Sequence, residues 1–166
     1  MVKIDPWTYW FAALLILVLP LDWLVGTVLA AAFHEACHIF VIRCLGGVIK
    51  GFEISPGGAV IKIGSIDNAG ELLAAAAGPL GSISTLLLMH AFPQIAISGM
   101  IQGIFNLIPI YPLDGGRIVA CLAEKLFPTR KELVLRWMEI LSYTLIFIAV
   151  FVGILFIFRL YFQAVL

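Results

Sequence analysis

The sequence predicts an all-α polytopic membrane protein with about five transmembrane helices and a small β-hairpin. Of its 166 residues, 63% are hydrophobic and only 12% are charged, and the mean hydropathy is +1.12. Soluble proteins carry about 45–50% apolar and about 25% charged residues, so this chain has too few charges to cover a soluble surface. Its apolar residues also gather in runs close to the roughly 20 residues that a spanning helix needs.

Five apolar segments account for the expected helices, and they lie at about 7–21, 23–45, 71–92, 94–112 and 137–160. The first opens with Trp7, Tyr9 and Trp10, a set of aromatic residues typical of a membrane interface. The fourth is expected to break near its end, because Pro109 and Pro112 cannot continue a helix.

Two shorter stretches connect these segments. Residues 46–64, GGVIKGFEISPGGAVIKIG, hold two β-branched runs around a Pro-Gly-Gly turn at 56–58, and this pattern predicts the hairpin, directly after the second segment. Residues 116–127, GRIVACLAEKLF, are too few to span a bilayer and are expected at its surface. Thr129 and Glu132 then have the spacing of a capping box, which predicts the start of the last helix.

Positive charges gather in two loops on one side of the predicted bundle. The loops after the second and fourth segments carry or adjoin most of the basic residues: Arg43, Lys50, Lys62, Arg117, Lys125, Arg130, Lys131 and Arg136. Cytoplasmic loops of membrane proteins carry such an excess. These loops and the N-terminus are therefore predicted in the cytoplasm, and the C-terminus on the outside.

The whole chain, residues 1–166, is expected to form a single membrane-embedded domain, because its length leaves no room for a second folded domain. No cleavable signal peptide is evident at the N-terminus.

The net charge is zero, which gives no electrostatic case for a nucleic-acid partner. The odd number of cysteines, Cys37, Cys44 and Cys121, argues against a disulfide framework.

An H-E-x-x-H motif, residues 34–38, lies inside the second apolar segment. Ionisable residues at membrane depth are costly and indicate function by default. His34 and His38 are four residues apart, so both imidazoles lie on one helix face and can bind one zinc ion. Glu35 lies beside the metal without binding it, where it can take a proton from a water that the metal activates. The alternative is that the two histidines only make polar contacts between helices.

A catalytic zinc site usually has three protein ligands and one open position, so a third ligand is needed. His90 is one candidate, but it is predicted on the side of the membrane away from the charged loops. Asp114 is the better candidate, because backbone freed at Pro109 and Pro112 is tolerated at depth only where it is buried or lines a cavity. On local sequence alone, Asp114 fits an ordinary Asp-Gly turn equally well.

Three motifs resemble those of the site-2 proteases, which are intramembrane zinc metalloproteases. The first is H-E-x-x-H at 34–38, and the second is G-x-x-x-N/S/G in the next segment, matched by Gly78 to Ser82. The third is N-x-x-P-x-x-P-L-D-G, which residues 106–115 match at every position. Their order and spacing also fit, and the resemblance covers about residues 20–118. The branch that processes a membrane-tethered pro-sigma factor during sporulation is the most similar.

The resemblance implies that His34, His38 and Asp114 bind one zinc ion (Zn2+) per chain. It also implies that Glu35 is the general base and that Asn106 contacts the substrate. The expected protein is a multi-pass protein of the bacterial cell membrane that cleaves a transmembrane or membrane-tethered segment of another membrane protein within the lipid bilayer. Its active site is expected toward the cytoplasm. The family often carries a PDZ or CBS domain, and neither is expected here, so substrate choice would come from the membrane core, the hairpin or a regulatory membrane protein.

Two rival interpretations stay open at this point. A membrane H-E-x-x-H protease of another family would use a glutamate or histidine in place of Asp114. A catalytically silent scaffold, or pseudoprotease, would bind a client transmembrane segment without cutting it, although an intact Glu35 argues against this. The hairpin is open as well: residues 59–63 either offer a strand edge to an extended substrate, or the hairpin only plugs the site or lies on the lipid surface.

Overall fold

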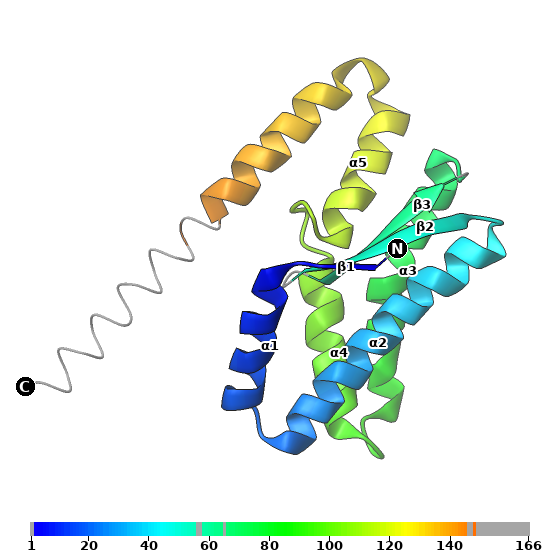
Figure 1. The fold of residues 1–166 in the computed structure, drawn as a ribbon. Helices are drawn as coiled ribbons and strands as arrows, with labels where there is room; N and C mark the ends of the chain where they lie inside the picture. The colour runs from blue at the N-terminus through cyan, green and yellow to red at the C-terminus, as the bar shows by residue number, and fades with distance from the viewer. Residues whose placement is uncertain (1, 56–57, 65, 146–147, 149–166) are drawn as a thin grey trace, which may run out of the picture.

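The computed structural model describes residues 2–55, 58–64, 66–145 and 148, and it is mainly helical, as predicted (Figure 1). In chain order the elements are β1 (Val2–Ile4), α1 (Pro6–Val18), α2 (Leu21–Cys44), β2 (Val48–Ser55), β3 (Gly58–Gly64), α3 (Asn68–Ser84), the 3-10 turn η1 (Thr85–Leu88), α4 (Pro93–Asn106), α5 (Asp114–Leu126) and the 3-10 turn η2 (Pro128–Arg130). Residues 131–145 form a further helix.

Helices α2, α3 and α4 pack on one another and form the core of the described structure (Figure 1). Small buried side chains occupy their interfaces, namely Ala30 of α2, Ala74 and Ala75 of α3, and Ala96 of α4. Such residues let helix backbones approach closely, as is common for helices packed in membranes. Helix α5 packs against α3 at the end of the bundle where α2 ends and α3 begins.

Two glycines set the distance between α3 and α4. A Cβ atom at Gly103 would lie 2.8 Å from the carbonyl oxygen of Pro79 and 3.1 Å from the Cβ of Ser82. A Cβ atom at Gly99 would lie 3.0 Å from the carbonyl oxygen of Ser82. Since backbone atoms of a packed helix cannot move aside, any larger residue at either position would push the two helices apart.

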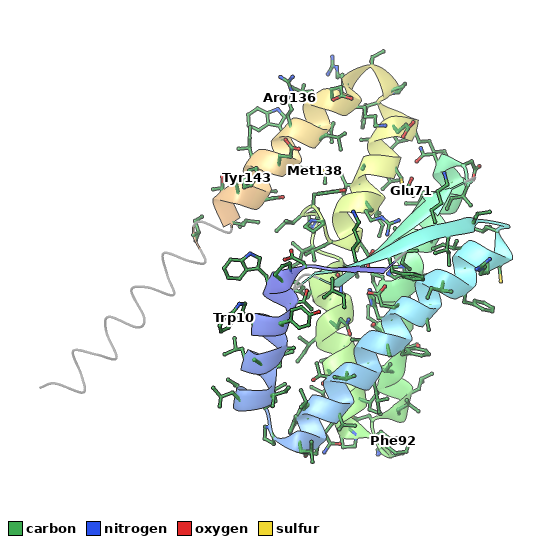
Figure 2. The ribbon with its side chains drawn as sticks, viewed as in Figure 1. Trp10, Glu71, Phe92, Arg136, Met138 and Tyr143 are labelled. Carbon is green, nitrogen blue, oxygen red and sulfur yellow. The ribbon has the colours of Figure 1, made fainter. Side chains whose placement is uncertain are left out.

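Much of the helical surface is apolar and open to the surroundings. Helix α2 and the continuous segment Asn68–Leu88 are long and apolar enough to cross a membrane, and only 28% and 33% of their most apolar windows are buried. Figure 2 shows Trp10, Phe92 and Tyr143 on the outside of the structure, where each is exposed. Apolar surface on this scale suits hydrocarbon better than water. These are two of the five predicted spans, and the count of five stays a prediction.

A three-stranded sheet of order β1-β2-β3 lies at the α5 end of the bundle (Figure 1). Strands β2 and β3 pair antiparallel in the predicted place. Of the turn predicted at 56–58, Gly58 is the first residue of β3, and residues 56 and 57 lie outside the described part of the chain. Ile61 of β3 packs with Ile42 of α2 and Ala74 of α3, which anchors the sheet to the bundle. Strand β1 pairs parallel with β2 and was not predicted, because three residues are too few to show a periodic pattern.

The fourth predicted segment, about 94–112, is helical only as far as Asn106, so its helix is shorter than expected. Helix α4 ends at Asn106, because Pro109 and Pro112 lack the backbone N–H that a continuing helix needs. The chain then turns sharply, and α5 begins at Asp114. The turn lies very close to the start of α5. A Cβ atom at Gly115 would overlap the backbone carbonyl oxygens of Leu107 and Ile108 in the turn.

The last helix starts at residue 131, close to the predicted capping signal at Thr129 and Glu132 and before the apolar segment expected from about 137. Thr129 itself lies inside the 3-10 turn that precedes the helix. Of the predicted segment 137–160, residues 146–147 and 149–160 lie outside the described residues. The stretch expected at the membrane surface is helical and forms most of α5.

Replacing Gly103 by alanine tests the packing of α3 on α4. Gly103→Ala is expected to lower stability by about 1–3 kcal/mol, because overpacking a tight contact forces the helices apart. Thermal unfolding of the purified protein in detergent measures this change. Ile104→Val, which trims an exposed side chain on the same helix, is the control and should leave the midpoint nearly unchanged. Equal midpoints for Gly103→Ala and the wild type would contradict the proposed contact.

Candidate metal centre

Helix α2 carries both histidines of the H-E-x-x-H motif on its buried face. His34 and His38 are separated by one helical turn, and they are only 2% and 3% exposed. Burying two imidazoles in a helical bundle is costly unless their nitrogens find partners. The two imidazole rings meet edge to face, with their centroids 4.8 Å apart. Their Nε2 atoms point toward each other.

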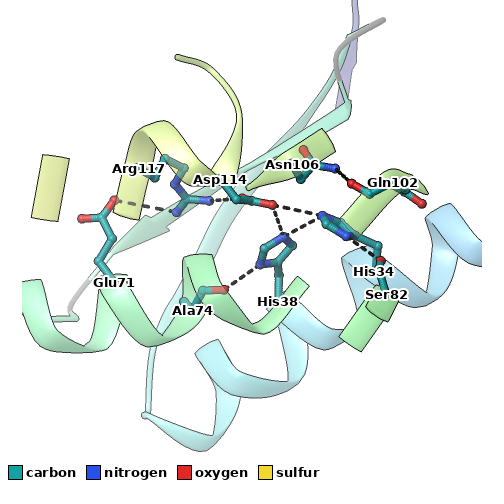
Figure 3. Close-up of polar contacts among 9 residues, drawn as sticks. All are labelled: His34, His38, Glu71, Ala74, Ser82, Gln102, Asn106, Asp114 and Arg117. Carbon is teal, nitrogen blue, oxygen red and sulfur yellow. Dashed lines mark hydrogen bonds and ion pairs between the residues drawn. The ribbon is translucent and has the colours of Figure 1, made fainter. Parts of the chain in front are cut away.

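Asp114, the first residue of α5, completes this cluster (Figure 3). Its Oδ2 atom lies 3.1 Å from His34 Nε2 and 3.1 Å from His38 Nε2, and the two Nε2 atoms are themselves 3.1 Å apart. Asp114 as a whole residue is 7% exposed. Residues that are 80 positions apart in the sequence thus bring three potential ligand atoms to one point.

The three atoms fit a zinc ion. Two ligands placed about 2.0–2.1 Å from a tetrahedral zinc ion lie about 3.3 Å apart, close to the observed separations. The donor set of two imidazoles and one carboxylate is also one that catalytic zinc sites use. His38 Nδ1 lies 2.6 Å from the Ala74 carbonyl oxygen, which can only accept, so the ring donates there and directs Nε2 to the cluster. A cation between the three atoms offsets their mutual repulsion.

Helix α3 supplies the partners on the far side of each ring. Besides the Ala74 carbonyl on His38, the Ser82 hydroxyl lies 2.9 Å from His34 Nδ1. Such outer hydrogen bonds orient the rings of metal-binding histidines and set which nitrogen faces the metal. Ser82 is fully buried, as expected for a residue held between helices.

Gly78 of α3 lies directly against the cluster. A Cβ atom there would overlap the His38 ring and would come within 2.8 Å of His34 Nε2. The first glycine of the G-x-x-x-N/S/G motif therefore lets α3 lie close to the histidine helix. Gly81, one turn further on, lies in the same way against the Cys37 side chain.

The other face of the Asp114 carboxylate meets a basic residue. Arg117 Nη1 lies 3.6 Å from Asp114 Oδ1, and Arg117 Nη2 lies 3.7 Å from Glu71 Oε1 of α3. Arg117 therefore pairs with the carboxylate oxygen of Asp114 that does not meet the imidazoles.

The structure places the remaining predicted site residues as follows. Glu35 follows His34 on α2 and is half-buried, with its Oε2 atom inside the protein. Asn106 ends α4 beside the cluster, and its amide donates to the Gln102 carbonyl oxygen at 3.1 Å (Figure 3). His90, the discounted candidate, is exposed after η1 and is not part of the cluster.

Three contacts of the site were not predicted: those of Ser82, Arg117 and Glu71. Ser82 was predicted only as the last position of the G-x-x-x-N/S/G motif, and Arg117 only as a positive charge of the loop. The spacing of Arg117 three residues after Asp114, on one face of a helix, is a signal that points to their pairing. Nothing in the local sequence of Glu71 indicates its contact, because Arg117 belongs to a distant part of the chain.

Comparisons with known proteins agree with this geometry. Residues 64–152 match the family profile described as Peptidase family M50. Zinc metalloprotease MJ0392 of Methanocaldococcus jannaschii is 34% identical over 110 residues, covering 58% of this chain and 32% of that protein. This chain therefore spans about a third of the length of that curated relative. The solved structure of the site-2 protease from the same organism shares the fold, with a TM-score of 0.73 at 22% identity over 94% of this chain and 81% of that one.

The fold and the site together define a helical protein with an H-E-x-x-H centre of the metallopeptidase type. The profile match covers more than half of the chain, including the Asp114 motif, and the histidines just upstream of it meet Asp114 in space. The chain belongs to peptidase family M50, the site-2 protease family. The resemblance drawn from three motifs is confirmed at the level of the family, and the sporulation branch stays a prediction.

Replacing Gly78 by alanine tests whether the space beside the imidazoles is required. The added methyl group would displace the rings from their partners on α3, so Gly78→Ala is expected to lose most of its bound zinc. Metal content per purified chain, measured by elemental analysis, shows the loss. Leu80→Ala, which trims an exposed side chain of the same helix, is the matched control and should keep its zinc. Full zinc content in Gly78→Ala would contradict the tight contact.

Proposed function

We propose that this chain is a zinc metalloendopeptidase that cleaves a transmembrane or membrane-tethered segment of another membrane protein. The convergence of His34, His38 and Asp114 at mutual distances of 3.1 Å is the observation that carries this proposal. Membership of a peptidase family supports it, and so does the printed name of the curated relative, a zinc metalloprotease. The three residues would hold one zinc ion.

The roles of the residues follow from their chemistry. A zinc ion held by this cluster would supply a Lewis acid that polarises a peptide carbonyl and acidifies water. The Glu35 carboxylate, on the next position of the same helix, takes the proton of the attacking water as general base. It then returns that proton to the leaving amine nitrogen as general acid. Asn106, at the end of α4 beside the cluster, is proposed to hold the backbone of the substrate.

A membrane substrate fits the surroundings of the site. The ligand helix α2 is long and apolar enough to cross a bilayer, so the cluster on it would lie at membrane depth, where a membrane-embedded substrate segment also lies. We place the chain as a multi-pass protein of the bacterial cell membrane, with residues 1–166 as one domain. The charge distribution described above supports a site that faces the cytoplasm. A regulatory membrane partner is part of the same proposal.

The first test combines metal content with cleavage. The wild type, Glu35→Gln and Asp114→Ala are purified in detergent, zinc per chain is measured, and each is incubated with a tethered transmembrane peptide. The wild type is expected to bind about one zinc ion and to cut. Glu35→Gln is expected to keep the zinc and to lose about 10²–10⁴-fold in rate, because only the proton carrier is removed. Asp114→Ala is expected to lose both.

Two matched variants control this test. His90→Ala removes the histidine outside the cluster, and Glu139→Gln neutralises an exposed glutamate, so both are expected to keep zinc and cleavage. Zinc loss in His90→Ala with retention in Asp114→Ala would contradict the ligand set. Zinc without cleavage in the wild type would favour the scaffold interpretation over the protease.

The sheet gives a further prediction. Strand β3 is an edge of the sheet, so its outer side is available to an extended substrate that pairs with residues 59–63. Deleting residues 52–62 is expected to abolish cleavage and to leave zinc bound, because no proposed ligand lies on the sheet. Deleting residues 2–4 removes the opposite edge strand and is the control. Unchanged cleavage after the first deletion, with zinc retained, would refute the clamp role.

A further inference from the structure

Helix α3 contacts the proposed zinc ligands His34 and His38 directly, and it is linked to the third ligand, Asp114, through Arg117. Its Ser82 hydroxyl meets His34, and its Ala74 carbonyl oxygen meets His38. Asp114 comes from α5, and the α3 residue on that side is Glu71, whose carboxylate meets Arg117. Figure 3 shows Arg117 between the two carboxylates of Glu71 and Asp114.

The two oxygens of Asp114 have separate partners. Oδ2 faces both imidazoles at 3.1 Å, whereas Oδ1 faces Arg117 Nη1 at 3.6 Å. A carboxylate rotates easily about its last torsion angle, which has a broad energy minimum. A cation fixed on Oδ1 therefore restricts the rotation that would carry Oδ2 away from the imidazoles. The side chains of Asp114 and Arg117 are 9% and 19% exposed, so solvent screens their attraction less than at an open surface.

We propose that Arg117 is a positioning residue that orients the Asp114 carboxylate toward the metal, and that Glu71 holds Arg117 in place. This inference rests on the proposed zinc site and describes how its third ligand is held. Glu71 has a second effect, because its negative charge offsets that of Arg117 beside a divalent cation. The ion pairs also connect α5, which brings the carboxylate, to the helix that orients both histidines.

The guanidinium group suits this position better than an ammonium group. Its planar fork presents separate N–H groups to Asp114 and Glu71 at once, with Nη1 on one carboxylate and Nη2 on the other. A lysine at this position keeps the charge as a single point on a flexible stem, so it can orient one carboxylate at a time. Arg117→Lys is therefore expected to fall between the wild type and Arg117→Gln.

The test measures the zinc dissociation constant of the full-length protein in detergent by competition with a chelator. Arg117→Gln is expected to weaken zinc binding about 10-fold or more, the range found for residues that orient metal ligands. Glu71→Gln is expected to weaken it less, because the Glu71 side chain is 48% exposed. The double variant is expected to bind no more weakly than Arg117→Gln alone, because Glu71 acts through Arg117.

Two matched variants separate this role from a general effect of charge. Glu124→Gln removes a carboxylate of α5 that is 50% exposed and pairs with Lys131 at 3.0 Å, away from the cluster. Arg136→Gln removes an exposed arginine, labelled in Figure 2, from the helix at 131–145. Both are expected to keep the zinc affinity of the wild type.

A second measurement uses cobalt in place of zinc. The visible spectrum of bound Co2+ reports the arrangement of its ligands, and a residue that only stabilises the fold would leave this spectrum unchanged. A changed spectrum in Arg117→Gln, with wild-type spectra in Glu124→Gln and Arg136→Gln, supports the positioning role. If Arg117→Gln does not fold, Glu71→Gln and Arg117→Lys decide by the same two measurements.

The possible failures are distinguishable. Wild-type zinc affinity and cobalt spectrum in the Arg117 and Glu71 variants would overturn this inference and leave the proposed protease intact. Equal weakening in the two control variants would overturn it too, since it would show an effect of net charge. A wild-type protein that binds no zinc would overturn the proposed function, and the inference with it.

Discussion

The structure depends on holding one carboxylate oxygen 3.1 Å from two imidazole nitrogens inside a helical bundle. Three electron-rich atoms at this distance repel one another, and their burial removes the water that would screen them. A cation among them turns the repulsion into attraction, but only if the rings and the carboxylate point inward. Helix α3 meets this condition for the rings, since Ala74 and Ser82 bond to their outer nitrogens.

The glycines of the bundle allow the close helix packing that these short contacts need. Side-chain contacts as short as those of Ser82 with His34 require α3 to lie almost against α2, and Gly78 allows this because any Cβ atom would strike the rings. Gly99 and Gly103 bring α4 equally close to the other side of α3. The glycine-led motif is thus at once a packing motif and a part of the metal site, and the two uses cannot be separated by substitution at Gly78 alone.

The parts of the site that the sequence predicts are those that depend on local geometry. His34 and His38 lie on one face because of the helical period, and Pro109 and Pro112 end α4 because they lack an N–H group. Asp114 could not be told from an ordinary turn by local pattern, since its role depends on how α5 lies against α2. The contact of Arg117 with Glu71 depends in the same way on the packing of α5 on α3, and strand β1 exists only because β2 lies beside it.

The polar contacts of the site also bear on how the helices assemble. In a bilayer the burial of apolar surface gives little drive for helices to associate, so close packing and polar contacts between them carry more of the stabilisation. Here these contacts join α2, α3 and α5 at a single cluster, and metal binding to ligands on two helices favours the assembled state over the separated one. The cluster that we propose as the catalytic centre therefore also stabilises the packing of α2, α3 and α5. A substitution there changes both, which is why metal affinity and cleavage have to be measured on the same variants.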